Sequence, residues 1–584
     1  MQIKYNYTVI YQRVMMNILQ NYNQDRCTSK IKLRPGKMVM RLNRMGAFHQ
    51  SRLSFMRVLL RKLRTEKWSF DQPIWRIDHK GVGVATYCAH GPERTYTLIV
   101  FSHDLKDDLR SDRVIAKAWD ATFTLCDGEV DEEQITRLRS NVPLQEAGRI
   151  SQTEIVLSRA NKSLRLFSHV RKCLANGAQP NRNMIDQVGY LMRTTAVYGA
   201  GKFGAADLDC WVGRPEFLGS FQPEMLTVWL IRAFSVDLVE HMARVDSPQT
   251  SVKLDPEIRR RLGVGNSTGL GMAPFLINHP TLINSWIHAR ETALARVRAL
   301  DFANDTTLLA FKILVRRAKL STKNWKVSDP HQIKKIENLR SDLDALLKKS
   351  LELSDSTFCP WNTLYEWGMA KMSIEGQEAL ISLMIEPYGA LVDDLSATMS
   401  ADETALNRID GHQTISALKE LVQKAYDWAK ELDFDSAPAR ARIWYISEEK
   451  LEPRLGERFE EKLEPFEQPL SPGYDAMKLL DDLSQFDNCT SVGEFLLSFP
   501  KHRHIIRRVQ TIASMEYAEI QDNTIDAKMM PIDLLRCKLS FFGATKFDPR
   551  SDRWLRINLF QHMPFPNELS KFDPDDMVFP QLTD

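Results

Sequence analysis

Cysteine is scarce in this chain of 584 residues, and its eight cysteines show no paired spacing. There is no Cys-x-x-Cys pair, and no cysteine stands at zinc-finger spacing from a histidine, so a zinc-finger domain is not predicted. A chain of this length does not need disulfide bonds to fold, which favours reduced thiols and a cytoplasmic location. The His-Glu-x-x-His motif is also absent, and we expect no dedicated metal site.

Long apolar runs are missing as well. The best candidate, Met225 to Met242, is interrupted by Arg232, Asp237 and Glu240, whereas a membrane span needs roughly 20 apolar residues. We therefore expect a buried core helix there and no membrane span. Neither a Walker A loop nor a Gly-x-Gly-x-x-Gly fingerprint after a clear strand occurs, so no cofactor is favoured.

The charge balance is uneven along the chain. The net charge is only +3, yet the segment from Arg26 to Arg64 contains 12 lysine and arginine residues and no aspartate or glutamate. Such a segment can contact nucleic acid or a membrane surface. It can equally pack on the acidic surface of the protein itself or of a second subunit.

Only one part of the sequence has a clear β pattern. Three short runs between residues 74 and 102, separated by turn sequences, predict a small antiparallel meander. Elsewhere, apolar spacing predicts helices at about 112–125, 131–140, 152–175, 182–198, 223–245, 275–300, 306–320, 331–352, 375–397, 413–431, 475–484, 503–519 and 531–541. The expected fold is a mainly α, multi-domain helical protein with a small antiparallel β meander near the N-terminus, α+β overall.

Changes in composition divide the chain into six expected segments. They are a basic tail or extension at 1–37, an α+β region with the meander at 38–150, a central helical region with glycine-rich loops at 151–300, a helical region at 301–446, an acidic, proline-containing linker at 447–474 and a C-terminal helical unit at 475–584. The stretches 191–203 and 534–547 share a Leu-x-Arg start and a Gly-Ala-x-Lys-Phe end. The last unit is therefore a candidate distant repeat of 180–210, with chance as the competing explanation.

The strongest functional signal is the segment 263–272, which holds four glycines, an amide and two hydroxyls before Pro274. Glycines allow close approach of the backbone to a ligand, and a helix start presents N–H groups to an anion. We expect an anion-binding loop here, in which Thr268 can act as a nucleophile beside a base. The expected substrate contacts are Gly265, Asn266, Ser267 and Gly269. The alternative is that the glycines serve only close packing.

A second glycine-rich stretch, 198–204, holds Lys202 between glycines. Lys202 can reach an anion or act as a base if it is buried, with Arg193 and Tyr198 as substrate contacts. A helix C-cap with an exposed lysine explains the same pattern equally well. His279 follows the first glycine segment closely, which gives Lys202, Thr268 and His279 as the expected catalytic set.

These signals favour a cytosolic enzyme that acts on a small anionic metabolite, bearing a carboxylate or a phosphate, by acid–base chemistry of the lyase or hydrolase type. The alternative is a nucleic-acid-associated binding or regulatory protein that uses the segment from Arg26 to Arg64. A third possibility is a structural or assembly protein that docks partners. A second subunit is a candidate partner.

Overall fold

The fold is that of a computed structural model, which describes residues 31–106, 118–142, 153–196, 214–217, 219–269, 276–277, 279–323, 325, 330–399, 408–433, 472–521, 536–549 and 554–577. Every structural statement below concerns these residues. Most of the predicted basic tail (1–37) and of the predicted linker (447–474) lies outside them.

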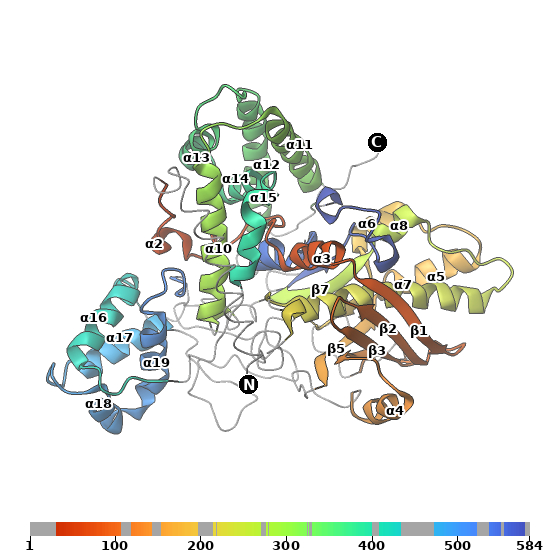
Figure 1. Ribbon diagram of the computed structural model, residues 1–584, viewed down its shortest axis with the longest axis horizontal. Helices are drawn as coiled ribbons and strands as arrows, with labels where there is room; N and C mark the ends of the chain where they lie inside the picture. Colours follow the sequence, from red (N-terminus) through yellow and green to blue (C-terminus); the bar gives the residue numbers. More distant parts are fainter. Residues whose placement is uncertain are drawn as a thin grey trace.

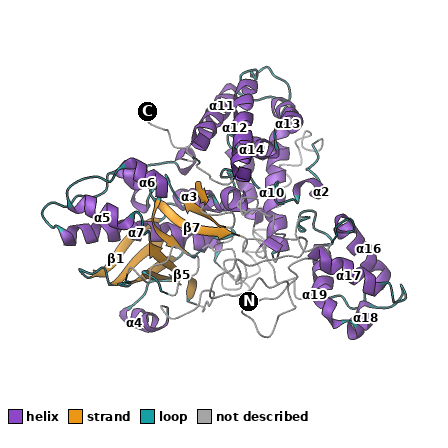
Figure 2. Ribbon diagram, turned by 180° about the vertical axis from the view of Figure 1, so that it is seen from behind, coloured by secondary structure: helices purple, strands orange, loops and turns teal. Residues whose placement is uncertain are grey.

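Within the described residues, nine strands form one sheet in the order β1-β2-β3-β4-β5-β6-β7-β9-β8 (Figures 1 and 2). They are β1 (Ser69–Ile77), β2 (Gly83–His90), β3 (Thr95–Ser102), β4 (Ala121–Asp127), β5 (Glu154–Lys162), β6 (Tyr190–Thr194), β7 (Gly263–Gly269), β8 (Lys546–Pro549) and β9 (Trp554–Leu559). β6 and β7 run parallel, and the other neighbouring strands run antiparallel. The sheet therefore joins the N-terminal and C-terminal parts of the chain.

The predicted fold class, mainly α with a small meander, is wrong. The meander is present as β1, β2 and β3, but it is one end of a larger mixed sheet. Strands β4, β5 and β6 occupy segments that were predicted to be helical, and β7 occupies the glycine-rich segment that was predicted to be a loop. Pairing with neighbouring strands decides the structure of such segments, because strand propensity depends strongly on context.

Helices make up most of the remaining structure. The α-helices are α2 (Gly36–Val39), α3 (Phe55–Thr65), α4 (Glu132–Asn141), α5 (Phe167–Ala175), α6 (Arg182–Val188), α7 (Gln222–Asp246), α8 (Pro256–Arg260), α10 (Pro280–Arg298), α11 (Asp305–Lys323), α12 (Pro330–Ser350), α13 (Pro360–Lys371), α14 (Ile374–Ile385), α15 (Gly389–Val392), α16 (Ile415–Tyr426), α17 (Pro472–Leu483), α18 (Val492–Ser498) and α19 (Arg503–Ile512). The 3₁₀ helices are η3 (Pro215–Phe217), η4 (Asp393–Met399), η6 (Asp427–Ala429), η8 (Pro500–His502), η10 (Pro566–Glu568) and η11 (Pro574–Met577), whereas η9 (Lys538–Phe542) is a π-helix.

Helix α7 lies at the centre of the main core, and most of its 25 residues are buried. Its one buried arginine, Arg232, donates from Nε to the Leu262 carbonyl oxygen at 2.6 Å and from Nη1 to the Met563 carbonyl oxygen at 2.8 Å. Backbone carbonyl oxygens thus accept hydrogen bonds from the Arg232 guanidinium, which belongs to a mostly apolar helix. Among the helices that the structure describes, none combines the length and apolarity needed to cross a membrane.

Helices α16 to α19 enclose a second, smaller core, which includes Leu418, Leu479 and Val509 (Figure 1). α16 precedes the predicted linker at 447–474, α17 begins within its last three residues, and α18 and α19 follow it. Arg508 of α19 connects this core to the main one, because its Nη1 donates to the carbonyl oxygen of Ile277 at 2.5 Å. Helices from both sides of the predicted linker therefore pack together, and the six-segment division of the chain stays a prediction.

The described part of the basic segment packs against carboxylates of the protein itself. Arg34 forms buried ion pairs with Glu291 at 2.7 Å and Glu378 at 2.9 Å. Arg57, on α3, pairs with Glu386 at 2.7 Å and with Asp575 at 2.9 Å. These ion pairs agree with the interpretation that the basic segment packs on acidic side chains of its own chain.

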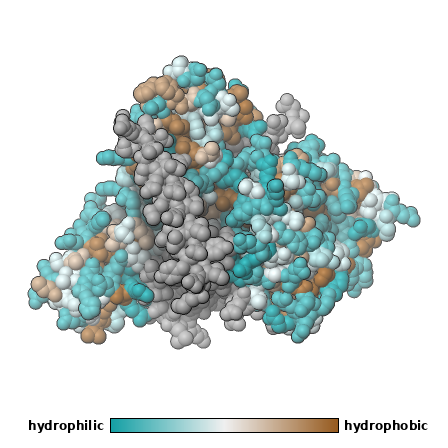
Figure 3. Space-filling model, in the orientation of Figure 1, coloured by the Kyte–Doolittle hydropathy of each residue, from teal (hydrophilic) through white to brown (hydrophobic). Residues whose placement is uncertain are grey.

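The surface shown in Figure 3 is largely hydrophilic, with apolar patches near α11 to α13. Phe302, Leu309 and Phe358 belong to this end of the molecule and are 58%, 57% and 64% exposed. The rings of Phe302 and Phe358 contact each other at a centroid distance of 5.7 Å. No described element covers these side chains.

Candidate active site

The glycine-rich segment 263–272 begins as strand β7 and not as the expected loop before a helix. A Cβ atom on Gly263 would lie 2.5 Å from the Leu559 carbonyl oxygen, and one on Gly265 would lie 2.8 Å from the ring of Tyr190. Close packing within the sheet therefore requires these glycines, and this requirement is independent of any ligand.

Three of the predicted site residues meet where β6 and β7 pair. Arg193 is in register with Gly265, and Asn266 Nδ2 donates to the Thr194 carbonyl oxygen at 3.0 Å. Asn266 is fully buried, and no described residue offers its Oδ1 a hydrogen-bond partner. The structure thus brings these three residues together, but it places them within the sheet.

The other predicted site residues are not described as part of this group. Ser267, Thr268 and Gly269 continue β7 opposite β9, and the structure describes only their backbone. His279 is buried at the N-cap of α10. Lys202 and Tyr198 lie outside the described residues, so the expected pocket shared by the two glycine-rich stretches stays a prediction.

A different group of polar side chains surrounds the π-helix η9. This element ends at Gly543, whose φ of 93° lies in the left-handed region that favours glycine. A Cβ atom at Gly543 would lie 2.9 Å from Met56 Cβ and 3.2 Å from Ser54 Oγ. The end of η9 is therefore packed directly against the start of α3. Such π-helical turns are rare and occur frequently at functional sites.

Two helix N-termini converge on η9. The N-cap residue of α3 is Ser54 and that of α7 is Phe221, and in neither helix does the N-cap side chain accept a hydrogen bond from the first turn. The ring of Phe542 lies 5.1 Å from that of Phe55 and 4.7 Å from that of Phe221. Because helix N-termini carry a partial positive charge, their convergence favours an anion at this junction.

Two polar side chains at these N-termini are buried with open hydrogen-bonding capacity. Ser54 is fully buried, Gln222 is 2% exposed, and Gln222 Nε2 donates to the Phe55 carbonyl oxygen at 3.4 Å. No described residue provides a partner for Ser54 Oγ or for Gln222 Oε1. Phe221 has a φ of 58°, a left-handed conformation that is uncommon for a bulky residue. Strain of this kind tends to concentrate at functional sites.

Lys538, the first residue of η9, is fully buried at this junction. Its Nζ lies 4.0 Å from the centre of the Phe542 ring. Burial disfavours the charged ammonium and lowers the pKa of Lys538 to about 7. Burial also raises the pKa of the neighbouring Cys537 thiol to about 12, so this thiol remains protonated near neutral pH. Lys538 is consequently the group at this junction that can exchange a proton at physiological pH.

A second buried cation, Arg536, lies just before η9. Arg536 is two positions before Lys538, so the two side chains leave the helix on different sides. Arg536 Nη2 donates to Glu375 Oε1 at 2.8 Å, and the guanidinium lies 4.7 Å from the centre of the Phe48 ring. We assign Arg536 to the packing of this element, because a carboxylate partner and a ring contact both hold its guanidinium.

Sequence reasoning did not single out Lys538, Ser54 or Gln222. One signal was present, since Arg536 and Lys538 are two cations within an otherwise apolar run that ends at Gly543. That run was noted only as half of the candidate repeat. The two halves differ in structure, because Leu191 to Thr194 form β6 whereas Lys538 to Phe542 form the π-helix.

Comparison with protein-family models, curated proteins and solved structures gives no match to this chain. A function must therefore be argued from the site itself.

Proposed function

We propose that this chain is an enzyme that acts on a small carboxylate- or phosphate-bearing metabolite by acid–base chemistry, of the lyase or hydrolase type. Its site is the junction of α3, α7 and η9, where Lys538 transfers the proton. The observation that carries the proposal is the convergence of two helix N-termini, uncapped by their own N-cap side chains, on Phe542 of η9, whose ring also contacts the buried Lys538.

The chemistry of this junction suits an anionic substrate. The N-terminal N–H groups of α3 and α7, together with the hydroxyl of Ser54, can donate to a carboxylate or a phosphate. A general acid or base works best when its pKa is near the working pH, and the pKa of Lys538 is about 7. Glu224, buried in the first turn of α7, is an acidic side chain at the same helix end and a candidate proton partner.

Burial of Lys538 and Ser54 has two consequences for this proposal. Exclusion of water strengthens each electrostatic interaction with a bound anion. It also requires the covering side chains to move before a substrate can enter, so binding is expected to be slower than diffusion allows.

The nucleic-acid alternative is the less favoured proposal. Arg34 and Arg57, both in the basic segment, are engaged in buried ion pairs with carboxylates of the same chain. The cytoplasmic location is part of the proposal and is supported by the described cysteines, which are free thiols.

The proposal is tested first by ligand-induced stabilisation. Sulfate, inorganic phosphate and a panel of small carboxylates are added to the full chain, and the Tm is measured for the wild type and for Lys538→Met. We expect at least one anion to raise the Tm of the wild type and not that of Lys538→Met. The methionine variant keeps the length of the side chain, and circular dichroism verifies that it is folded.

Two further variants decide between this site and the one predicted from the sequence. Lys202→Ala and Thr268→Ala remove the predicted catalytic groups of the glycine-rich stretches. If these variants lose the anion response and Lys538→Met keeps it, the site at η9 is wrong. For metabolites that stabilise the wild type, mass spectrometry follows their conversion, and Lys538→Met is expected to slow it at least about 100-fold.

A further inference from the structure

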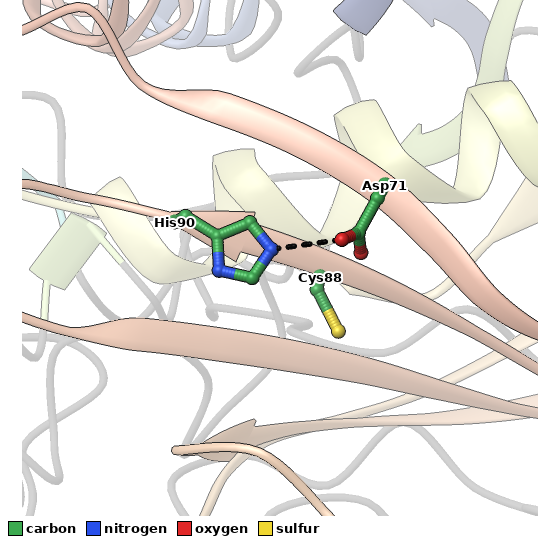
Figure 4. Close-up of side chains that lie close together, drawn as sticks. All are labelled: Asp71, Cys88 and His90. Atoms are coloured by element: carbon green, nitrogen blue, oxygen red, sulfur yellow. Dashed lines mark hydrogen bonds and ion pairs between the residues drawn. The ribbon is translucent and has the colours of Figure 1, made fainter.

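A group of metal-ligating side chains lies on β1 and β2, away from the groups used above. Cys88 and His90 are two positions apart on β2, so their side chains share one face of the sheet. Asp71 on β1 is the registered partner of Cys88 and therefore presents its carboxylate on the same face. Figure 4 shows Asp71 and His90 turned toward each other, with Cys88 beside them.

The three side chains are close enough to share one ion. One ligand atom of each lies within 4.8 Å of the others, and His90 Nε2 is 3.1 Å from Asp71 Oδ2. Bonds of about 2.0–2.3 Å to a tetrahedral ion set ligand atoms roughly 3.5 Å apart. Binding of an ion at this spacing requires side-chain rotation, because the separations extend up to 4.8 Å.

Each of the two ligands on β2 has a hydroxyl partner behind it. His90 Nδ1 lies 3.0 Å from Thr95 Oγ1, and Cys88 Sγ lies 3.6 Å from Thr97 Oγ1. A histidine that binds a metal through Nε2 usually donates its Nδ1–H to a nearby acceptor, which fixes the ring and its tautomer. Thr95 is in position to be that acceptor.

The local charge also favours a cation. The Asp71 carboxylate lies beside both other ligand atoms, and a dication is attracted by this carboxylate and stabilises the thiolate form of Cys88.

We propose that Asp71, Cys88 and His90 form a zinc site with three protein ligands and one position for water or another ligand. Thiolate, imidazole and carboxylate are the three ligand types that zinc takes from proteins. The exposed Asp71 leaves the remaining position on the solvent side of the sheet. This inference is independent of the function proposed for the η9 junction, and it replaces the sequence-based expectation that the chain has no dedicated metal site.

The pattern was difficult to recognise in the sequence. Cys88-Ala-His90 has a spacing that suits one face of a strand and not a zinc finger, and Asp71 is supplied by the neighbouring strand. Only the register of β1 with β2 connects the three.

The experiment uses Co²⁺ as a spectroscopic substitute for zinc in the full chain, reduced and stripped of metal with a chelator. We expect one equivalent to give a sulfur-to-cobalt charge-transfer band and the intense visible bands of tetrahedral cobalt, both abolished by Zn²⁺. Cys88→Ser is expected to lose the charge-transfer band. Asp71→Asn and His90→Gln should each weaken binding, and Asp71 is exposed, so Asp71→Asn is expected to leave folding intact.

Two variants make this test specific. Thr95→Val removes the hydroxyl beside His90 without changing the shape of the side chain, and we expect about 10- to 100-fold weaker Zn²⁺ binding. Cys173→Ser is the matched control, because Cys173 lies 3.6 Å from His169 on α5 but belongs to no described three-ligand group. Absence of the charge-transfer band in the wild type, or its loss in Cys173→Ser and not in Cys88→Ser, would overturn the proposal.

Discussion

Two of the regions in which this protein buries positive charge do so in opposite ways. The first, here called the arginine seam, consists of Arg52, Arg57 and Arg61 with Glu386, Asp393 and Asp575. The second is the junction around Lys538. Burial alone would lower the pKa of Arg57, but Glu386 and Asp575 outweigh burial and raise it. At Lys538 burial prevails, and the pKa falls to about 7.

The difference separates a structural cation from one suited to chemistry. A guanidinium held by carboxylates keeps its charge at every physiological pH and serves to fix the chain. An amine among aromatic rings and helix N-termini can gain or lose its proton near neutral pH. Helix α3 belongs to both regions, because it carries Arg57 and Arg61 and begins at Ser54. The arginine seam therefore positions the N-terminus of α3 at the junction.

The largest expected effect comes from breaking the arginine seam. Arg57→Met leaves Glu386 buried without its main partner, and we expect a loss of about 3–5 kcal/mol in the free energy of unfolding. Denaturant titration measures this loss. Arg64→Met, on the same helix, removes an exposed pair with Asp573 and is expected to cost less than about 1 kcal/mol. Equal losses in the two variants would contradict a structural role for the seam.

The next effect is a pH dependence that belongs to Lys538. In the unfolded chain a lysine has a pKa of about 10.4, whereas in the folded protein that of Lys538 is about 7. Between these values the unfolded state binds more protons, so stability rises with pH by about 1.4 kcal/mol per unit. We expect this contribution to disappear in Lys538→Met, which should also be more stable than the wild type at pH 7.

The control for this contribution is a partly exposed lysine that forms an ion pair. Lys62→Met removes a partly exposed lysine that pairs with Glu66, and its stability is expected to follow the wild-type pH profile between about pH 7 and 9. If Lys538→Met and the wild type show the same slope in that range, the lowered pKa of Lys538 is wrong.

The smallest effect on stability is expected at Ser54. Its hydroxyl is buried, and no described residue is bonded to its Oγ, so Ser54→Ala should change the free energy of unfolding by less than about 1 kcal/mol. The anion response of the Tm should nevertheless decrease, because the hydroxyl is proposed to bind the substrate. A large loss of stability with an unchanged anion response would indicate a structural role instead.

The elements that could be predicted from the sequence are those with a pattern in their own residues, such as helical spacing of apolar side chains or flanking turn sequences. The helix predicted at 413–431 contains α16, because Ile415, Leu418 and Val422 recur at helical spacing and are buried. The strands of the meander carry turn sequences between them and were also predicted. By contrast, β7 consists of three glycines, Val264 and three small polar residues. This segment is a strand because its backbone pairs with β6 on one side and β9 on the other.

The candidate sites show the same limit. Three distant segments of the chain supply Ser54, Gln222 and Lys538. No sequence motif indicates that the N-termini of α3 and α7 lie close together. Asp71, Cys88 and His90 depend on strand register in the same way. The glycine-rich segment was the most visible pattern, but its glycines at 263 and 265 are explained by contacts with Leu559 and Tyr190.

Anion binding at the η9 junction is expected to be coupled to protonation of Lys538. Calorimetric titration with sulfate at pH 8, in two buffers of different ionisation enthalpy, measures the protons taken up on binding. A bound anion favours the ammonium form, so we predict uptake of about one proton by the wild type and none by Lys538→Met. Sulfate binding without proton uptake, or with equal uptake in both proteins, would contradict the account.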